Sequence, residues 1–501
     1  MVSLLLLLLL CFGPHLATTG FYLDDWSLLS RAMPQGHPDF FASIKAFAVS
    51  GFWLRPVEIL HYPLLIAIGG LSPWRYRLMG LILEWALGGF IFLFLRRLSG
   101  SAYLALWAAG LALIYPTHRS THIWMTNSVP VAAFALVFLS LWAHLKWRDT
   151  RKNIWRVAAL GAYGLSSLEY EAAAFLPAAL WAGRAARDWA DGSSPSDALK
   201  KAGFEMRGFI GVLFAALIYK SWAVPMFSAE PSRDVVIRFS HLFKVFSAAL
   251  SVSTVETVSL AFDSVKRSGG EFGPVLWALL VPASYGLSRA LDAGRDKEKG
   301  LRRAAIVLTA VAAAVFVCGY MPFFFTGMYT PRMYGVVNRV NLAGGISLGM
   351  LCAVGFSLIR FGPKTRALLG TLVISVCAVC HWDGGLQWTK AWTMQKEIIG
   401  DIREQLPPGP ATVVIVSAPP WIHRAPVFKT DYDVTHALWM ATGRRDIRGN
   451  FAFAGRLEPQ GMYVLNGDKM EKRYPYENLY AYNGKTRRVY AVENITSDLG
   501  F

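Results

Sequence analysis

Charged residues are scarce in this chain. Asp, Glu, Lys and Arg make up 17% of the 501 residues, whereas soluble domains carry about a quarter. Hydrophobic residues make up 54%, and windows such as 129–145, 304–325 and 338–359 run for roughly 17 to 22 residues with at most one charge, long enough to cross a bilayer. The composition excludes an ordinary soluble globule and predicts a polytopic membrane protein.

Cysteine is also rare, and its positions exclude a disulfide framework. The five cysteines all lie in or beside apolar segments: Cys11, Cys318, Cys352, Cys377 and Cys380. The stretch Cys377 to His381 fits the C-x-x-C-H signature of c-type haem. It closes an apolar helix with no soluble pocket around it, so we expect small thiols packed between helices and no haem.

The excess of basic over acidic residues gives a net charge of +17. Most Lys and Arg lie in short stretches between apolar windows, so we interpret them as a topology signal and expect no nucleic-acid partner. The basic stretches, all assigned to the cytoplasmic side, are 96–97, 146–156, 184–207, 289–303 and 360–366. No positive residue precedes the leucine-rich stretch Met1–Ala17, which favours a retained first helix over a cleaved signal peptide.

The connecting segments between successive spans must lie on alternate sides of the membrane. With the basic stretches on the cytoplasmic side, the apolar windows predict an all-α polytopic membrane protein with about eleven transmembrane helices. The membrane module would cover residues 1–382. Its principal outer segments would be 18–77, 116–128, 225–273 and 326–339, with a short turn at 169–171. Residues 383–501 would form a small extracytoplasmic α/β domain, because 411–417 reads as a buried strand and 462–465 and 488–492 are strand-like.

Two adjacent carboxylates, Asp24 and Asp25, follow the first expected span, between aromatic residues. Like charges at a low-dielectric boundary repel, which prepares one group for base or metal chemistry. Asp also favours the N-cap of a helix. Both interpretations stay open on the pair alone.

Cationic side chains occur in the same outer segments. Arg55 precedes a proline that opens an apolar helix, so it could cradle a phosphate or extend to lipid headgroups. His118 and His122 stand four residues apart and flank Arg119. They could bind zinc or phosphate, but two ligands without a third are a weak metal signal, and solvated interfacial histidines are the alternative.

Further polar residues lie on the same predicted side. Glu169 and Glu171 occupy a tight turn between two expected spans. Burying a carboxylate there without a partner would cost roughly several kcal/mol of free energy. Arg332 and Arg339 add two cations in a later outer segment. These motifs together predict one polar site on the outer face.

The motifs resemble those of the GT-C superfamily, polytopic glycosyltransferases that use polyprenyl-phosphate sugars and include protein O-mannosyltransferases and the aminoarabinose transferase of lipid A. The resemblance covers residues 1–177 by motif and the remainder by layout. In this superfamily an acidic pair follows the first helix, as Asp24 and Asp25 do. One branch also has an Arg-Pro, a Pro-x-His loop ending in Trp, and a Glu six residues before Pro. The matching residues are Arg55–Pro56, Pro116, His118, Trp124, Glu171 and Pro177.

The chain departs from that branch at four positions. Arg77, Gly80 and Glu84 stand where the branch tends to carry His, Asn and His, and Tyr170 replaces a frequent Lys. Donor and acceptor preference therefore do not carry over.

The resemblance implies an inverting displacement in which Asp24 removes the proton from an acceptor hydroxyl. Asp25 would orient the acceptor or hold a metal. Substrate-binding residues would be Arg55, Arg339, His118, Arg332, Arg119, His122, Glu169 and Glu171. A divalent cation is undecided, with Asp24, Asp25, His118 and Glu171 as its candidate ligands. The partners would be a polyprenyl-phosphate-linked sugar, a glycan, lipid or protein acceptor, and membrane lipids.

Two alternatives remain. An O-antigen ligase or polymerase also uses lipid-linked donors, but such enzymes concentrate Arg and His in one late outer loop. A transporter or flippase would place ionisable residues in mid-span and often show inverted repeats. The sequence has no internal repeat, and Glu84 is the only carboxylate well inside an expected span. We expect a bacterial inner-membrane enzyme with its active site facing the periplasm.

Overall fold

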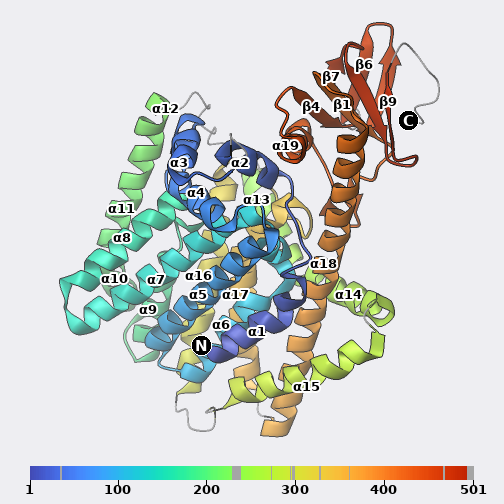
Figure 1. Ribbon diagram of the computed structural model, residues 1–501. Helices are drawn as coiled ribbons and strands as arrows, with labels where there is room; N and C mark the ends of the chain where they lie inside the picture. Colours follow the sequence, from blue (N-terminus) through green and yellow to red (C-terminus); the bar gives the residue numbers. More distant parts are fainter. Residues whose placement is uncertain are drawn as a thin grey trace.

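The computed structural model describes residues 1–33, 37–227, 239–271, 273–293, 295, 300–326, 329–359, 361–466 and 469–492. A bundle of helices makes up most of the molecule, and one long helix leads from it to a domain that contains all the labelled strands (Figure 1). Parts of four predicted segments lie outside the described residues. They are 34–36 in 18–77, 228–238 and 272 in 225–273, 327–328 in 326–339, and 467–468 and 493–501 in 383–501.

The helices of the first half form the side of the bundle that carries most of the predicted site. They are α1 (Val2–Phe12), α2 (Asp24–Ala32), α3 (Phe40–Val49), α4 (Glu58–Gly69), α5 (Pro73–Ser99), α6 (Ala102–Ile114), α7 (Ser128–Thr150), α8 (Asn153–Glu169), α9 (Ala178–Ala190), α10 (Pro195–Glu205) and α11 (Arg207–Ile218). Short 3-10 helices between them are η1 (Gly13–His15), η2 (Phe52–Leu54), η3 (Pro116–His122), η4 (Met125–Asn127) and η5 (Glu171–Ala173).

The second half completes the bundle. Its helices are α12 (Val224–Phe227), α13 (Phe239–Ser251), α14 (Thr257–Glu271), α15 (Gly273–Asp292), α16 (Leu301–Thr326), α17 (Leu342–Leu358) and α18 (Pro363–Gln405). Two π-helical turns, η6 (Tyr219–Ala223) and η7 (Val252–Glu256), continue α11 and α13, and the 3-10 helix η9 (Val336–Asn341) precedes α17.

The bundle core is built from helices that are apolar on every side. α7 packs against α5 and α8, and α17 packs against α6 and α16. Phe134, Phe138 and Leu141 of α7 are almost fully buried. A helix that is apolar all round is stable only when other helices or lipid surround it, which explains why α7 is central.

Seven helical stretches among the described residues are long and apolar enough to cross a membrane. They are Pro73–Ser99, Met125–Thr150, Arg207–Met226, Phe239–Glu271, Leu301–Phe325, Val337–Leu358 and Pro363–Gln405. Shorter apolar helices include Val2–His15 and Ala102–Ile114. The predicted class, an all-α polytopic membrane protein with a small C-terminal α/β domain, is confirmed.

One of the seven stretches, Phe239–Glu271, lies in a segment that the sequence predicted as an outer loop, 225–273. It is helical because its apolar residues recur at helical spacing. Val245 and Ala249 face the bundle, whereas Phe239 and Phe243 are exposed. The predicted loop therefore contains a long apolar helix along α16 and α18.

The predicted domain boundary at residues 382 and 383 falls inside α18, which continues to Gln405. α18 has 43 residues, or about 65 Å at 1.5 Å per residue, twice the thickness of a hydrocarbon core. No Pro interrupts the chain between Pro363 and Pro407, so nothing ends the helix where the apolar stretch ends. The separate domain begins at Ala411.

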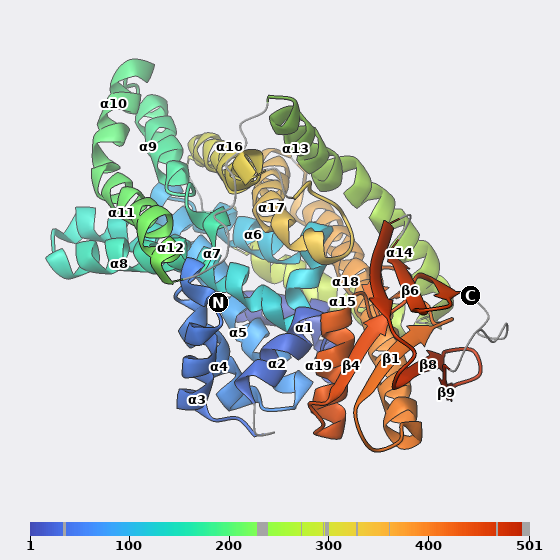
Figure 2. The ribbon, with the colours of Figure 1, turned by 90° about the horizontal axis from the view of Figure 1, so that it is seen from above.

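The C-terminal domain joins a mixed sheet to one helix, α19 (Asp431–Thr442). Its strands are β1 (Ala411–Val416), β2 (Trp421–Ile422), β3 (Ala425–Pro426), β4 (Ile447–Phe451), β5 (Ala454–Glu458), β6 (Gly461–Asn466), β7 (Lys469–Tyr474), β8 (Leu479–Asn483) and β9 (Arg488–Ala491). The main sheet has the order β4-β1-β8-β9, with β1 parallel to β4 and β8. Seen from above, α19 lies between this sheet and α2 (Figure 2).

Candidate active site

The two adjacent carboxylates point into different surroundings. Leu23, which precedes them, has a φ of 49°, a left-handed conformation that is unusual for a residue with a side chain and is often found at functional sites. Leu23 is the N-cap of α2, and no side chain caps the helix there. The structure therefore does not support the interpretation of the acidic pair as an N-cap.

Asp25 is fully buried. Its Oδ2 accepts from the Tyr22 backbone N–H at 3.1 Å, and its Oδ1 accepts from the N–H and the hydroxyl of Thr126 at 3.1 and 2.8 Å. Burial raises the pKa of Asp25 to about 6, against the opposing charge of Arg77 and these hydrogen bonds. Asp25 thus joins α2 to η4 and is not open to a substrate.

Asp24 is only partly buried. Its Oδ1 accepts from the hydroxyl of Tyr432 in α19 at 2.7 Å. Across the described ranges, no protein group donates to its Oδ2. Asp24 is therefore the carboxylate that an acceptor hydroxyl could reach.

Arg339 is the cation that faces this carboxylate. Its guanidinium lies 5.4 Å from the centre of the Trp124 ring, and the charges of Asp24 and Arg55 and the phenol of Tyr170 act on it. Within the part of the chain that the structure describes, no Asp or Glu forms an ion pair with Arg339. Its positive charge is therefore available to an anionic ligand beside Asp24.

Arg55, by contrast, is neutralised by carboxylates. Its Nη2 lies 2.8 Å from Glu171 Oε2 and its Nη1 lies 3.2 Å from Glu58 Oε1. Lys220 also lies 2.9 Å from Glu171. Burial raises the pKa of Glu171, but Arg55 and Lys220 lower it more, so the net pKa is below its usual range. The four side chains form one ion-pair network that connects η2, α4, η5 and η6.

Glu169 lies close to this network but has a different partner. Its Oε1 is 2.8 Å from His61 Nδ1, and the other ring nitrogen of His61 is 2.9 Å from the Ser128 hydroxyl. Glu169 therefore pairs with α4 through His61, whereas Glu171 belongs to the Arg55 network, so the two carboxylates do not point at one ligand.

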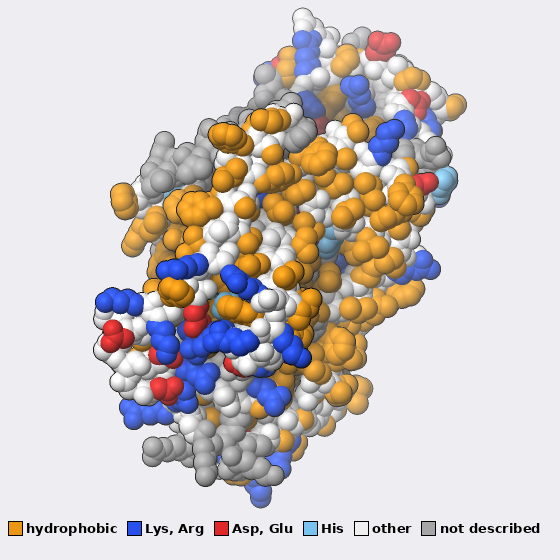
Figure 3. Space-filling model, turned by 90° about the vertical axis from the view of Figure 1, so that its left-hand side faces the viewer, with side chains coloured by type: hydrophobic (Ala, Val, Ile, Leu, Met, Phe, Trp, Pro, Cys, Tyr) orange, Lys and Arg blue, Asp and Glu red, His pale blue; other side chains and the backbone are white. Residues whose placement is uncertain are grey.

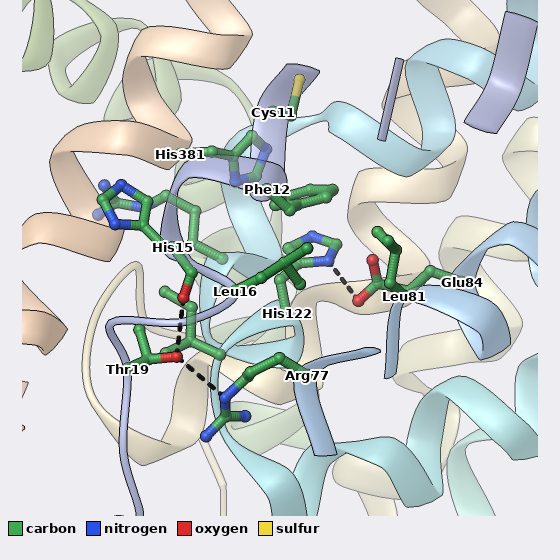
Figure 4. A pocket seen from close by; sticks show the side chains of 12 residues that line it. Cys11, Phe12, His15, Leu16, Thr19, Arg77, Leu81, Glu84, His122 and His381 are labelled. Carbon is green, nitrogen blue, oxygen red and sulfur yellow. Dashed lines mark hydrogen bonds and ion pairs between the residues drawn. The ribbon is translucent and has the colours of Figure 1, made fainter. Parts of the chain in front are cut away.

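A second polar cluster lies inside the bundle, between α1, α5, η3 and α18. His122 Nδ1 is 2.5 Å from Glu84 Oε1, and the His122 ring stacks on Phe12 (Figure 4). Arg77 donates to Thr19 and to the Gly20 carbonyl in the same region. These side chains border a cavity of about 20 Å³, room for about one water molecule.

The predicted histidines are uncharged in this environment. Burial lowers the pKa of His122 to about 3, and burial together with His122 lowers the pKa of His118 well below its usual range. Neutral imidazoles at pH 7 are weaker phosphate ligands than Arg339. Arg119 points away from Asp24, because it donates to the Cys380 carbonyl at 3.1 Å and lies 4.0 Å from Asp383.

Arg332 is exposed and joins none of these clusters through its side chain. The candidate metal ligands Asp24, Asp25, His118 and Glu171 lie in four different environments. Searching only the described residues, no three His, Cys, Asp or Glu side chains gather as a metal site requires. The structure thus brings Asp24 and Arg339 together, with the Arg55 network beside them, and leaves His118, Arg119, His122 and Arg332 apart.

Sequence reasoning missed four residues at this site. Glu58, His61 and Lys220 complete the ion pairs of Arg55, Glu169 and Glu171. Glu58 and His61 had a signal, since charged or polar residues three apart in the apolar helix after Arg55 need partners. Tyr432 had none, because it is 408 residues from Asp24.

The fold and this cluster define a class: a polytopic membrane protein whose polar site lies where the first outer segment meets a C-terminal domain. No family model matches the chain. Protein O-mannosyl-transferase TMTC2 from Mus musculus and from Homo sapiens are both 30% identical to it over 113 residues, 23% of this chain and 14% of theirs. The matched stretch is thus a small part of those relatives.

Two solved structures are similar at low identity. ArnT from Cupriavidus metallidurans bound to undecaprenyl phosphate has a TM-score of 0.47 and 14% identity, over 89% of this chain and 84% of ArnT. The Archaeoglobus fulgidus oligosaccharyltransferase with a tethered acceptor peptide has a TM-score of 0.39 and 12% identity, over 88% of this chain and 62% of that one. By their printed names, TMTC2 is a protein O-mannosyl-transferase and the Archaeoglobus fulgidus protein is an oligosaccharyltransferase.

Proposed function

We propose that the protein is a membrane glycosyltransferase that moves a sugar from a polyprenyl-phosphate donor to an acceptor hydroxyl on the extracytoplasmic face, with inversion. The observation that carries this proposal is that two functional groups occur at one place. Asp24 is open to a hydroxyl, and Arg339, on which the charge of Asp24 acts, forms an ion pair with no carboxylate of the described residues. The resemblance of the first 177 residues to GT-C enzymes and the match to O-mannosyl-transferases support the class.

In the proposed reaction, Asp24 Oδ2 accepts the proton of the acceptor hydroxyl. The freed oxygen attacks the anomeric carbon, and the bond from that carbon to the phosphate oxygen breaks. The polyprenyl phosphate leaves with one more negative charge. Arg339 stabilises that charge through charge-assisted hydrogen bonds. A single displacement with one base inverts the configuration of the sugar.

The Arg55 network has a different task in this proposal. Arg55 is held by Glu171 and Glu58, and Tyr170 lies under its guanidinium at 4.9 Å. It fixes the turn that carries Tyr170, whose phenol lies within electrostatic range of Arg339. Arg55 therefore shapes the phosphate site, while Arg339 supplies most of its free charge.

The test is a comparison of envelope glycans by mass spectrometry in cells of the source organism with the gene, without it, and with the Asp24→Asn variant. We expect the deletion to lack one sugar on one glycan, lipid or protein, in a bacterial inner-membrane pathway that faces the periplasm. The wild-type gene restores this sugar. Asp24→Asn does not, because an amide keeps the shape but cannot accept the proton, and loss of a general base costs about 10²- to 10⁴-fold.

The comparison needs a control for protein amount and donor binding. Asp24→Asn should reach the wild-type level in the membrane, and the purified variant should bind undecaprenyl phosphate as tightly as the wild type. An unchanged glycan profile in the deletion would contradict the proposed activity. A variant that restored the full sugar would remove Asp24 from the role of base.

A further inference from the structure

The C-terminal domain reaches the proposed base. α19 packs along α2, and both views place the two helices side by side (Figures 1 and 2). The hydroxyl of Tyr432 donates to Asp24 Oδ1 at 2.7 Å. This bond joins two segments 408 residues apart, so the position of the domain determines whether the bond forms.

The opposite end of α2 is held by the same domain. Arg445, which follows α19, donates to the carbonyls of Ser30 and Met33 at 3.2 and 3.3 Å. These carbonyls lie at and just beyond the last turn of α2, where a cation is favourable. The domain therefore contacts α2 at its first and its last turn.

A third connection passes through α18. The indole of Trp26 in α2 donates to Gln395 at 3.2 Å, and the amide of Gln395 donates to the Val427 carbonyl of the C-terminal domain at 2.6 Å. Gln395 is fully buried. A buried amide with both ends bonded fixes the two segments relative to each other.

Tyr432 itself sits on a rigid element. It lies in the first turn of α19, where Thr430 and Asp433 form a capping box. Asp433 is fully buried and accepts from the backbone N–H groups of Lys429 and Thr430 at 2.8 and 3.0 Å. Asp431, beside Tyr432, pairs with Lys472 of β7. The helix start that carries the phenol is therefore anchored within its own domain.

We propose that Tyr432 is a positioning residue of the active site, supplied by the C-terminal domain, whose hydroxyl holds Asp24 Oδ1 so that Oδ2 faces the acceptor hydroxyl. The inference rests on the proposed function. Asp24 follows a strained N-cap with no side-chain cap, so the phenol is the contact that fixes its carboxylate.

The test compares Tyr432→Phe with a matched control, Tyr482→Phe. Tyr482 donates to Asp401 at 2.8 Å, a bond of the same kind between the same domain and α18, away from Asp24. The full-length proteins are assayed in nanodiscs with a short-chain polyprenyl phosphate carrying the sugar found by the glycan comparison. Thermal unfolding and undecaprenyl phosphate binding show that each variant is folded.

We expect Tyr432→Phe to lower kcat about 10- to 100-fold, the loss typical of a hydrogen bond to a charged group, with little change in the KM for donor. Tyr482→Phe should keep the wild-type kcat and KM. A purely structural contact would lower the Tm and would leave the kcat of the folded protein unchanged.

A wild-type kcat in Tyr432→Phe would overturn the inference, and so would equal changes of kcat in both variants. Asp24→Asn, assayed in parallel, separates this failure from failure of the proposed function. An inactive Asp24→Asn with a normal Tyr432→Phe leaves Asp24 as base and removes only Tyr432. An active Asp24→Asn removes the base itself.

Discussion

At the scale of single residues, two consecutive carboxylates differ because the backbone turns sharply before them. The left-handed Leu23 directs Asp25 into the core and leaves Asp24 at the surface. The adjacent pair is visible in the sequence, and the role of Asp24 as base stays a prediction from the resemblance to GT-C enzymes. The sequence could not predict which carboxylate is buried, because that depends on Thr126 and on one φ angle.

Asp25→Asn tests this difference. The carboxylate of Asp25 accepts three hydrogen bonds. In Asn an NH2 group replaces one of the two oxygens and cannot accept a hydrogen bond, so at least one of these bonds is lost. We expect a loss of about 1 to 3 kcal/mol in the free energy of unfolding, seen as a lower Tm in detergent. Transfer should fall less than in Asp24→Asn, whose Tm should stay near wild type. The reverse order of the two Tm values would contradict the assignment.

Arg339 and Arg55 should also separate on substitution. Arg339→Ala removes an unpaired charge beside Asp24, so the KM for the lipid-linked donor should rise about 10- to 100-fold at wild-type Tm. Arg55→Ala leaves Glu58 and Glu171 without their main partner. The free energy of unfolding should therefore fall by about 1 to 3 kcal/mol, which is measured as a lower Tm. Unchanged donor KM in Arg339→Ala, with normal expression, would exclude it from the phosphate site.

At the scale of elements, apolar windows such as 129–145, 304–325 and 338–359 predicted long helices of the bundle, because length and hydrophobicity decide whether a helix can span a bilayer. Phe239–Glu271 was placed in the outer segment 225–273 by the alternation of sides, although its apolar residues recur at helical spacing. The predicted boundary at residues 382 and 383 follows the end of an apolar stretch, whereas α18 continues to Gln405, just before Pro407.

The capping box of α19 makes its stability depend on pH. Burial raises the pKa of Asp433 from 3.8 to about 7, against the backbone N–H groups that lower it. Because the pKa of Asp433 is higher in the folded state than in the unfolded state, protonated Asp433 stabilises the fold. This stabilisation is fully present below about pH 4 and is lost as the pH rises through 7. We therefore expect the wild-type Tm to fall between pH 5 and pH 8, and to fall less in Asp433→Asn. Equal slopes for the two proteins would contradict this account.

At the scale of the whole molecule, the proposed site and a large group of basic residues lie apart. Asp24 and the C-terminal domain meet at one end. At the other, basic residues gather over α8, α9 and α10, below a broad hydrophobic zone (Figure 3). Ion pairs such as Arg97 with Asp149 and Arg184 with Asp188 belong to that basic end. The contact between residues 24 and 432 could not be predicted, since no local pattern encodes how a distant domain docks.

This arrangement supports a topology that reporter fusions can test. Tags after Lys152 and Arg295 should be cytoplasmic, because both lie in basic stretches between spans. Tags after Gly270 and at Phe501 should be external. Gly270 is next to Glu271, which pairs with Lys390 of α18 at 2.9 Å, beyond the apolar part of that helix. The C-terminal domain must lie on the side of Asp24, because Tyr432 bonds to it. A cytoplasmic tag at Phe501, with Lys152 also cytoplasmic, would mean that α18 does not carry the domain to the outer face, and Asp24 could not then meet a periplasmic acceptor.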